Sequence, residues 1–220
     1  MKALSTALLT LALATHAFAA DRTISLLRMD LDLDGQPDLL RVVEGPRAGR
    51  PEVTDRRVEV RTAKGVRAIF TGLLRPVTYK GPQNSPCHTG IEEGGIELQG
   101  GNDVSVSLRR TGEASFVVTE EYEDQGCSYY GKREFQASLA DDGKFPLERA
   151  HRLVGHHGMG SGYYARADFD FQYFYGEEEL MDRTGDGENA SHKWEFPKSC
   201  TADLSAISDQ KIPACAEYRK

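Results

Sequence analysis

Several features that define common classes of protein are missing from this 220-residue chain. None of its four cysteines forms a C-x-x-C pair, and the only adjacent cysteine and histidine are Cys87 and His88, so a zinc site has little support. Residues 158–162 read G-x-G-x-G, which differs from the G-x-S-x-G turn of many serine hydrolases. Beyond the N-terminus, no apolar run is long enough to span a bilayer. Zinc proteins, serine hydrolases and helical membrane proteins are therefore disfavoured.

An excess of positive charge is also missing. The chain has 27 lysine and arginine residues against 34 aspartate and glutamate residues, which gives a formal net charge of -7. Phosphate backbones and anionic membranes attract basic proteins, so this acidic chain is not expected to bind nucleic acid or to insert into a membrane. A basic protein is the expected kind of partner.

The first nineteen residues are expected to form a cleavable signal peptide. Lys2 precedes an apolar run from Ala3 to Ala14, and Ala17 and Ala19 give the A-x-A pattern that predicts cleavage after Ala19. Lys2 is the only charged residue removed, so the formal charge changes from -7 to -8. No cysteine directly follows the cleavage point, so a lipid anchor is not expected. The mature protein is expected in the periplasm.

The mature chain, residues 20–220, shows no linker, low-complexity tract or long repeat and is expected to form a single domain. In an oxidising compartment four cysteines favour two disulfides, and the sequence alone permits three connectivities. The preferred pairing joins Cys200 to Cys215 around a closed C-terminal segment, and Cys87 to Cys127 between two turn-like segments.

Alternation of apolar and polar residues predicts an all-β fold of antiparallel sheets, arranged as a sandwich, a barrel or a propeller-like array. Turn-forming glycine, asparagine and aspartate residues separate the alternating segments. The expected strands cover residues 23–29, 39–43, 58–61, 104–108, 135–139, 168–175 and 193–196. Very little helix is expected, and the best candidate is Thr201–Ser208, with Thr201 as its N-cap.

An aspartate-rich segment between the first two expected strands, DLDLDGQPD at residues 30–38, predicts a calcium site. Aspartates stand at positions 1, 3, 5 and 9 of this segment and Gly35 at position 6, a spacing suited to oxygen ligands around Ca²⁺. The expected ligands are Asp30, Asp32, Asp34, Gln36 through its carbonyl, and Asp38. Arg41 stands at position 12, where an EF-hand has glutamate, and the loop instead resembles the D-x-D-x-D-G-x-x-D loops of integrin-type FG-GAP repeats. The calcium is expected to be structural, and a solvated acidic turn is the alternative.

A second acidic stretch runs from Asp182 through Asp186 to Asn189. It has fewer acidic ligands, and its Asp-Gly pair is also typical of a hairpin turn, so a turn is favoured over a second calcium site.

A glycine-rich stretch, GHHGMGSGYY at residues 155–164, is the most unusual part of the sequence. Such a loop lets the backbone approach a partner closely, and residues Ser161 to Tyr164 resemble the S-G-x-Y motif of periplasmic inhibitors of invertebrate-type lysozymes. The exported β-rich chain also resembles immunity proteins paired with lysozyme-like toxins of antibacterial secretion systems. The resemblance implies an inhibitory loop that enters the hydrolase cleft. Its expected residues are Gly160, Ser161, Gly162, Tyr163 and Tyr164.

Two other functions remain open. One is a calcium-stabilised extracytoplasmic adhesion or binding scaffold without inhibitory activity. The other is a hydrolase that uses His151, His156 and His157 as metal ligands or a general base. Adjacent histidines on a strand point to opposite faces, and no nucleophile has a matched base, so a protein without enzymatic activity is preferred.

Overall fold

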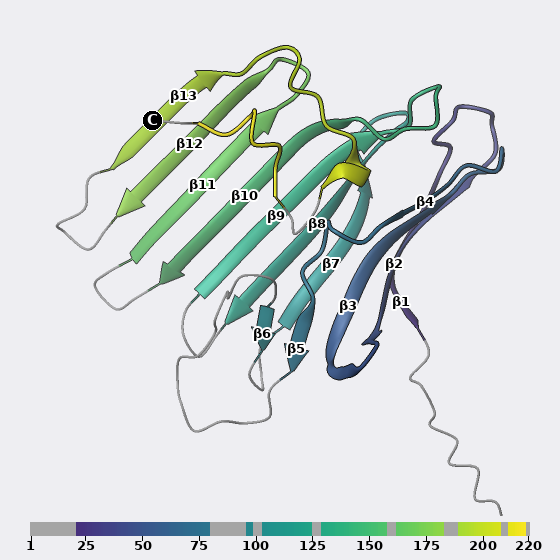
Figure 1. Ribbon diagram of the computed structural model, residues 1–220, viewed down its shortest axis with the longest axis horizontal. Coiled ribbons are helices and arrows are strands. Elements are labelled where there is room, and N and C mark those ends of the chain that lie inside the picture. The colour runs from purple at the N-terminus through teal and green to yellow at the C-terminus, as the bar shows by residue number, and fades with distance from the viewer. Residues whose placement is uncertain are drawn as a thin grey trace, which may run out of the picture.

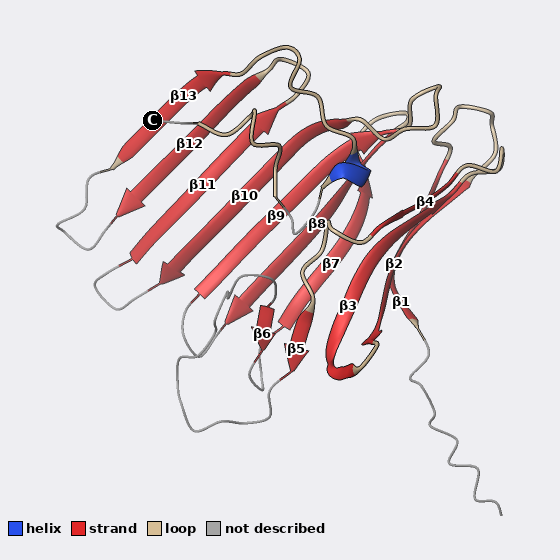
Figure 2. Ribbon diagram, viewed as in Figure 1, coloured by secondary structure: helices blue, strands red, loops and turns tan. Residues whose placement is uncertain are grey.

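The computed structural model describes residues 21–79, 96–98, 103–124, 129–157, 162–182, 189–207 and 211–218. Almost all of its regular structure is β-strand, in two sheets (Figures 1 and 2). The smaller sheet contains β1 (Arg22–Met29), β2 (Asp38–Arg47), β3 (Arg50–Arg61), β4 (Arg67–Phe70), β5 (Val77–Tyr79) and β6 (Ile96–Leu98). The larger sheet contains β7 (Asp103–Arg110), β8 (Ser115–Asp124), β9 (Tyr129–Ser138), β10 (Leu147–His157), β11 (Gly162–Asp170), β12 (Tyr175–Asp182) and β13 (Ala190–Glu195).

The larger sheet is a meander in which each strand pairs with its neighbour in the sequence, in the order β13-β12-β11-β10-β9-β8-β7. The smaller sheet has the order β1-β2-β3-β5-β6, and β4 also pairs with β3. Pairing is antiparallel among these strands, apart from the parallel pair β5 and β6. The prediction of an all-β fold with antiparallel sheets is confirmed, and the arrangement is an open sandwich.

The two sheets share one hydrophobic core. Alternation places Leu40 of β2 and both Phe116 and Val118 of β8 in the interior, each at most 1% exposed. Phe145, which precedes β10, packs edge-to-face against Phe116 and Phe70, with ring centroids 6.3 and 5.3 Å apart. These aromatic contacts join the sheets by burial of apolar surface, the main favourable contribution to folding.

A buried ion pair also joins the sheets. The Arg56 guanidinium of β3 donates to the Glu120 carboxylate of β8, and each side chain is only 2% exposed. Arg56 also donates twice to the carbonyl oxygen of Arg75, at 2.9 and 2.7 Å. The Arg75 N–H donates to Glu120 at 3.1 Å, and the Arg75 guanidinium lies 5.6 Å from the centre of the Tyr122 ring. Burial raises the pKa of Glu120, against the opposing effect of the Arg56 and Arg75 charges.

The prediction of one strand over residues 168–175 is wrong, whereas the other expected strands all overlap observed ones. β11 ends at Asp170, whose Oδ1 accepts hydrogen bonds from two backbone N–H groups of the following turn, both at 3.0 Å. Phe174 completes this turn with a φ of 57°. The aromatic residues still cluster, because Phe174 packs against Phe196 with ring centroids 6.1 Å apart. A side-chain-capped turn therefore interrupts the apparent alternation.

The expected helix Thr201–Ser208 is reduced to one 3₁₀ turn, Leu204–Ala206. Its N-cap is Asp203, which accepts a hydrogen bond from the Ser205 N–H at 2.8 Å, so the prediction that Thr201 is the cap is wrong. Among the described residues, none belongs to a helix with the length and apolar character needed to cross a membrane.

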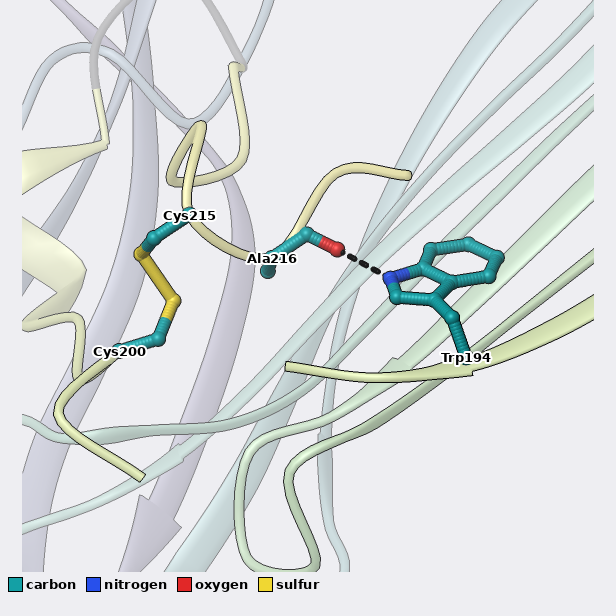
Figure 3. The surroundings of a disulfide bond; sticks show 4 residues. All are labelled: Trp194, Cys200, Cys215 and Ala216. Carbon is teal, nitrogen blue, oxygen red and sulfur yellow. Dashed lines mark hydrogen bonds between the residues drawn. A yellow bond between two sulfur atoms is a disulfide. The ribbon is translucent and has the colours of Figure 1, made fainter. Parts of the chain in front are cut away.

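The predicted disulfide between Cys200 and Cys215 is confirmed (Figure 3). Directly after it, the Ala216 carbonyl accepts a hydrogen bond of 2.8 Å from the Trp194 indole of β13. The C-terminal segment thereby crosses one face of the larger sheet (Figure 1). Cys87 and Cys127 lie outside the described residues.

Candidate functional site

The aspartate-rich loop joins β1 to β2 and brings three of its carboxylates together. Oxygen atoms of Asp30, Asp32 and Asp38 all lie within 4.8 Å of one another. The chain turns sharply here because Leu33 and Gly35 both have positive φ angles, of 54° and 83°. Glycine adopts this left-handed conformation without strain. The loop is thus a tight connection that directs carboxylates toward a common point.

Backbone N–H groups hold two of these carboxylates in place. Asp30 accepts hydrogen bonds from the N–H groups of Asp34 and Gly35, at 3.0 and 2.7 Å. Asp38 is 2% exposed, and it accepts from the N–H groups of Leu31 and Ala63, at 2.7 and 2.8 Å. The second of these bonds ties the loop to the turn between β3 and β4. The carboxylates are therefore positioned before any ligand binds.

Asp32 has the least satisfied carboxylate of the three. Its side chain is 10% exposed, and neither carboxylate oxygen has a hydrogen-bond partner in the described part of the chain. The Lys64 ammonium approaches one oxygen only to 3.6 Å and instead donates to the Asp32 backbone carbonyl at 3.2 Å. A buried carboxylate without hydrogen bonds is costly unless a cation compensates it. A pocket of about 200 Å³ borders Asp32 and Lys64 and offers a route for an ion.

The fourth expected carboxylate ligand, Asp34, has another position. Asp34 is not part of the carboxylate group, and its Oδ1 accepts a hydrogen bond of 2.8 Å from the Gln36 N–H. This hydrogen bond closes a local turn within the loop. In the second acidic stretch the Asp182 side chain and Asp186 lie outside the described residues, and Asn189 directly precedes β13. The donor set of the first loop, carboxylate oxygens alone, suits a hard cation such as Ca²⁺.

The glycine-rich stretch is mostly strand. β10 continues to His157, β11 begins at Gly162, and these two residues are paired. The expectation that residues 155–164 all form a loop is therefore wrong, and only residues 158–161 connect the two strands. Gly160 and Ser161 lie outside the described residues, as does the Tyr163 side chain.

Tyr164 is half-buried in β11, directly opposite Gly155 of β10. The absence of a side chain at Gly155 has a packing reason, because a Cβ there would lie 2.1 Å from the ring of Tyr130. Two tyrosines, Tyr130 and Tyr164, therefore flank Gly155 on neighbouring strands close to the end of the hairpin.

The three histidines of the catalytic alternative do not act from one face. His151 and His156 are five residues apart in β10, so their side chains point to opposite faces of the sheet. The His157 side chain lies outside the described residues. Because their side chains point to opposite faces, His151 and His156 cannot bind the same metal ion.

His151 has a partner that sequence reasoning missed. Its Nδ1 lies 2.7 Å from Asp168 Oδ1 on β11, and Arg166 donates to the other Asp168 oxygen at 2.6 Å. Burial raises the pKa of Asp168, but the hydrogen bonds from His151 and Arg166 outweigh this effect and lower it. The pair lies in a groove of about 410 Å³ that also includes Glu134 and Tyr175. None of the described residues lining it is a serine, threonine or cysteine that His151 can activate.

The groove belongs to the outer face of the larger sheet, the face directed away from the core. Glu134, His151, Asp168 and Glu177 stand directly opposite one another on four adjacent strands of this face. The acidic run at residues 120–124 is split between faces, because Glu120 is buried in the core. Glu120 is therefore not available to a basic partner, since it is paired with Arg56 in the interior.

No protein-family model matches this chain, and comparisons with curated proteins and with solved structures find no match.

Proposed function

We propose that this chain is an exported inhibitor of a lysozyme-like peptidoglycan hydrolase, and that it serves as an immunity protein in the periplasm. The observation that carries this proposal is the position of the S-G-x-Y residues. Gly162 and Tyr164 open β11 at the end of a long hairpin, and Ser161, which lies outside the described residues, directly precedes this strand in the sequence. The Cys200–Cys215 disulfide supports an oxidising compartment, as the expected signal peptide does.

The chemistry of the target explains how such a hairpin inhibits. A glycoside hydrolase uses two carboxyl groups on either side of the scissile bond. Hydroxyl groups of Ser161 and Tyr164 can donate hydrogen bonds to those carboxyls while the tyrosine ring occupies a sugar subsite. Hydrogen bonds to charged groups contribute about 1.5–3 kcal/mol each, and tyrosine is frequent among interface hot spots. Carboxylates of the outer face, such as Glu134 and Glu177, favour approach of a basic hydrolase.

Replacing Tyr164 by alanine should weaken inhibition more than Ser161→Ala, because it removes both a ring and a hydroxyl. A loss of about 2 kcal/mol is the lower limit for a hot spot and corresponds to about a thirtyfold weaker Kd. The measurement is peptidoglycan digestion by lysozyme-like hydrolases, including any encoded beside this chain, titrated with purified mature protein.

Tyr173 provides a matched control, because it lies 75% exposed in the turn after β11, at the opposite end of that strand. Tyr173→Ala should leave inhibition unchanged. Full inhibition by Tyr164→Ala would remove the hairpin end from the mechanism. Failure of the wild type against every hydrolase would favour a calcium-stabilised binding scaffold.

We further propose that the group Asp30, Asp32 and Asp38 binds a structural Ca²⁺. Three convergent carboxylates repel one another without a cation, and Asp32 has no hydrogen-bond donor among the described residues to compensate its burial. The ion would fasten the β1–β2 loop, which Asp38 already ties to the β3–β4 turn. Its role is stability of the smaller sheet, because each group of the loop is occupied by coordination or turn formation.

Removal of calcium should lower the melting temperature. At a free concentration of 100 times Kd, a ligand specific for the native state adds about 2.7 kcal/mol, which is roughly 5–10 °C for a domain of this size. Thermal unfolding with calcium, with chelator and with chelator followed by excess calcium measures the effect. Asp32→Asn should abolish the response, whereas Asp142→Asn, a change in an exposed turn acid paired with Lys144, should retain it. An unchanged melting temperature with chelator, together with no heat of calcium binding, would disprove the site.

A further inference from the structure

Four strands of the smaller sheet place three arginines in one row. Arg28 of β1 is opposite Leu39 of β2, Leu39 is opposite Arg61 of β3, and Arg61 is opposite Arg67 of β4. Neighbouring strands are about 4.8 Å apart, so this arginine row extends over roughly 14 Å. The three arginine side chains are exposed on the sheet face directed away from the core.

The arginine row lacks acidic partners. Within the described residues, the side chains of Arg28, Arg61 and Arg67 form no hydrogen bond or ion pair. The acidic side chain in the adjacent row of the same sheet face, Glu59, is already bound by Arg41 at 2.6 Å and by Arg57 at 2.8 Å. The carboxylates of the neighbouring aspartate loop are turned inward, toward loop N–H groups and one another.

Direct opposition of like charges makes this arrangement unfavourable for folding alone. Arg61 and Arg67 face each other across β3 and β4, and like charges in such a pair are destabilising. Arg41 of the same sheet avoids this cost by pairing with Glu59. An anion bound across the arginine row would relieve the repulsion, and guanidinium groups suit phosphate oxygens in particular.

The next row along the same strands adds apolar surface. It consists of Leu26, Arg41, Glu59 and Ile69, in register across β1 to β4. Leu26 is 54% exposed and Ile69 is 62% exposed, so two large aliphatic side chains flank an internally neutral ion pair. A free phosphate ion gains no favourable interaction from these apolar side chains. A membrane surface offers both phosphate groups and apolar chains beneath them.

The overall negative charge does not oppose such contact. Charges are screened beyond about 8 Å at physiological ionic strength, so a membrane touching this face senses the local arginines more than distant acids. The two rows together carry four arginines and one glutamate. This face of the smaller sheet is therefore basic, although the chain as a whole is acidic.

We propose that this face of the smaller sheet docks on an anionic phospholipid surface, with the arginine row on the phosphate groups and with Leu26 and Ile69 against the interface. The contact is peripheral and reversible. It would hold the protein at a membrane surface, and it is independent of hydrolase inhibition.

Co-sedimentation with vesicles tests the proposal, using phosphatidylcholine alone and phosphatidylcholine mixed with phosphatidylglycerol. The wild type should bind the mixed vesicles and lose binding as salt is raised. Each arginine near an anionic surface contributes about 1 kcal/mol, or about a fivefold change in partition coefficient. Replacing Arg28, Arg61 and Arg67 together by glutamine should weaken binding on the order of a hundredfold, while the melting temperature stays the same or rises.

Two further variants separate the alternatives. Arg109→Gln removes an exposed arginine of the larger sheet and should leave vesicle binding unchanged. Leu26→Ser with Ile69→Ser should weaken vesicle binding without altering the arginines. Equal binding by the triple arginine variant and the wild type, or no preference for anionic vesicles, would overturn the proposal. Unchanged binding of the Leu26 and Ile69 variant, with displacement by inorganic phosphate, would show a simple oxyanion site instead.

Discussion

Replacing Glu120 by alanine should lower the free energy of unfolding by about 3–5 kcal/mol, the usual cost of removing one partner of a buried ion pair. Glu120 and Arg56 are each 2% exposed, so the variant leaves the Arg56 charge between the two sheets without its carboxylate. Arg56→Met should cost a similar amount, because it also removes two hydrogen bonds to the Arg75 carbonyl. Urea unfolding followed by circular dichroism measures both losses.

The double variant Arg56→Met with Glu120→Leu tests whether the attraction within the ion pair exceeds the desolvation cost of burying it. Burial raises the pKa of Glu120, which means that desolvation of the carboxylate outweighs its attraction to Arg56 and Arg75. We therefore expect the double variant to be more stable than either single variant, since two apolar side chains carry no desolvation cost. Additive losses in this cycle would contradict this expectation, because they would show that Arg56 and Glu120 contribute independently and have no coupling energy.

The raised pKa also fixes the sign of a pH effect. Protonated Glu120 is favoured in the folded state, so its contribution to stability is complete below the ordinary pKa of 4.5 and is lost as pH rises through the folded value. The stability of the wild type relative to Glu120→Gln should therefore fall with increasing pH. A difference that grows in the opposite direction would mean that attraction to Arg56 dominates burial.

Features that depend on short stretches of sequence could be predicted. The strands follow from local alternation, and the β1–β2 loop was recognised because its aspartates lie within nine residues. The disulfide Cys200–Cys215 is likewise a short closure. The one wrong strand, at residues 168–175, shows the limit of alternation. Asp170 caps a turn there, and the aromatic pattern continues through it because both sides of the turn pack against Phe196.

Features that depend on register between strands could not be predicted. The pairs Arg56–Glu120 and His151–Asp168 join residues 64 and 17 positions apart. A shift of one residue in any strand would move these side chains to the other face of the sheet. The acidic run at residues 120–124 shows the same dependence on register, since Glu120 is buried in the core whereas Glu121 and Glu123 are exposed. Net charge likewise gave no sign of the arginine row, which exists only through pairing of β1 to β4.

Loss of the Cys200–Cys215 disulfide should cost about 3 kcal/mol, because the bond closes a loop of 15 residues and the chain-entropy model assigns roughly that amount to such a loop. The double variant Cys200→Ala with Cys215→Ala isolates this effect. Chemical denaturation of the variant and of the oxidised wild type gives the difference in free energy of unfolding. Peptide mass mapping of the wild type should recover the Cys200–Cys215 link, together with Cys87–Cys127 if the expected second pair forms.

Residues 211–218 should be the first part of the protein to respond to loss of the disulfide. Ile212 and Ala216 follow the sheet closely, at 6% and 0% exposure, and the Ala216 carbonyl holds the indole of Trp194 at 2.8 Å. Trp194 is the single tryptophan of the chain and its indole contacts this segment, so tryptophan fluorescence is sensitive to release of the segment. We expect the variant to show red-shifted emission and faster amide exchange at residues 211–218 before the sheets unfold. Without the bond to Cys200, the segment is held to the sheet by noncovalent contacts: its buried apolar side chains, the Trp194 hydrogen bond and the ring contacts of Tyr218 with His192 and Trp194. A variant that loses 3 kcal/mol with unchanged Trp194 emission would place the effect in the unfolded chain. A variant as stable as the wild type would show that Ile212, Ala216 and the indole hydrogen bond hold the segment without the disulfide.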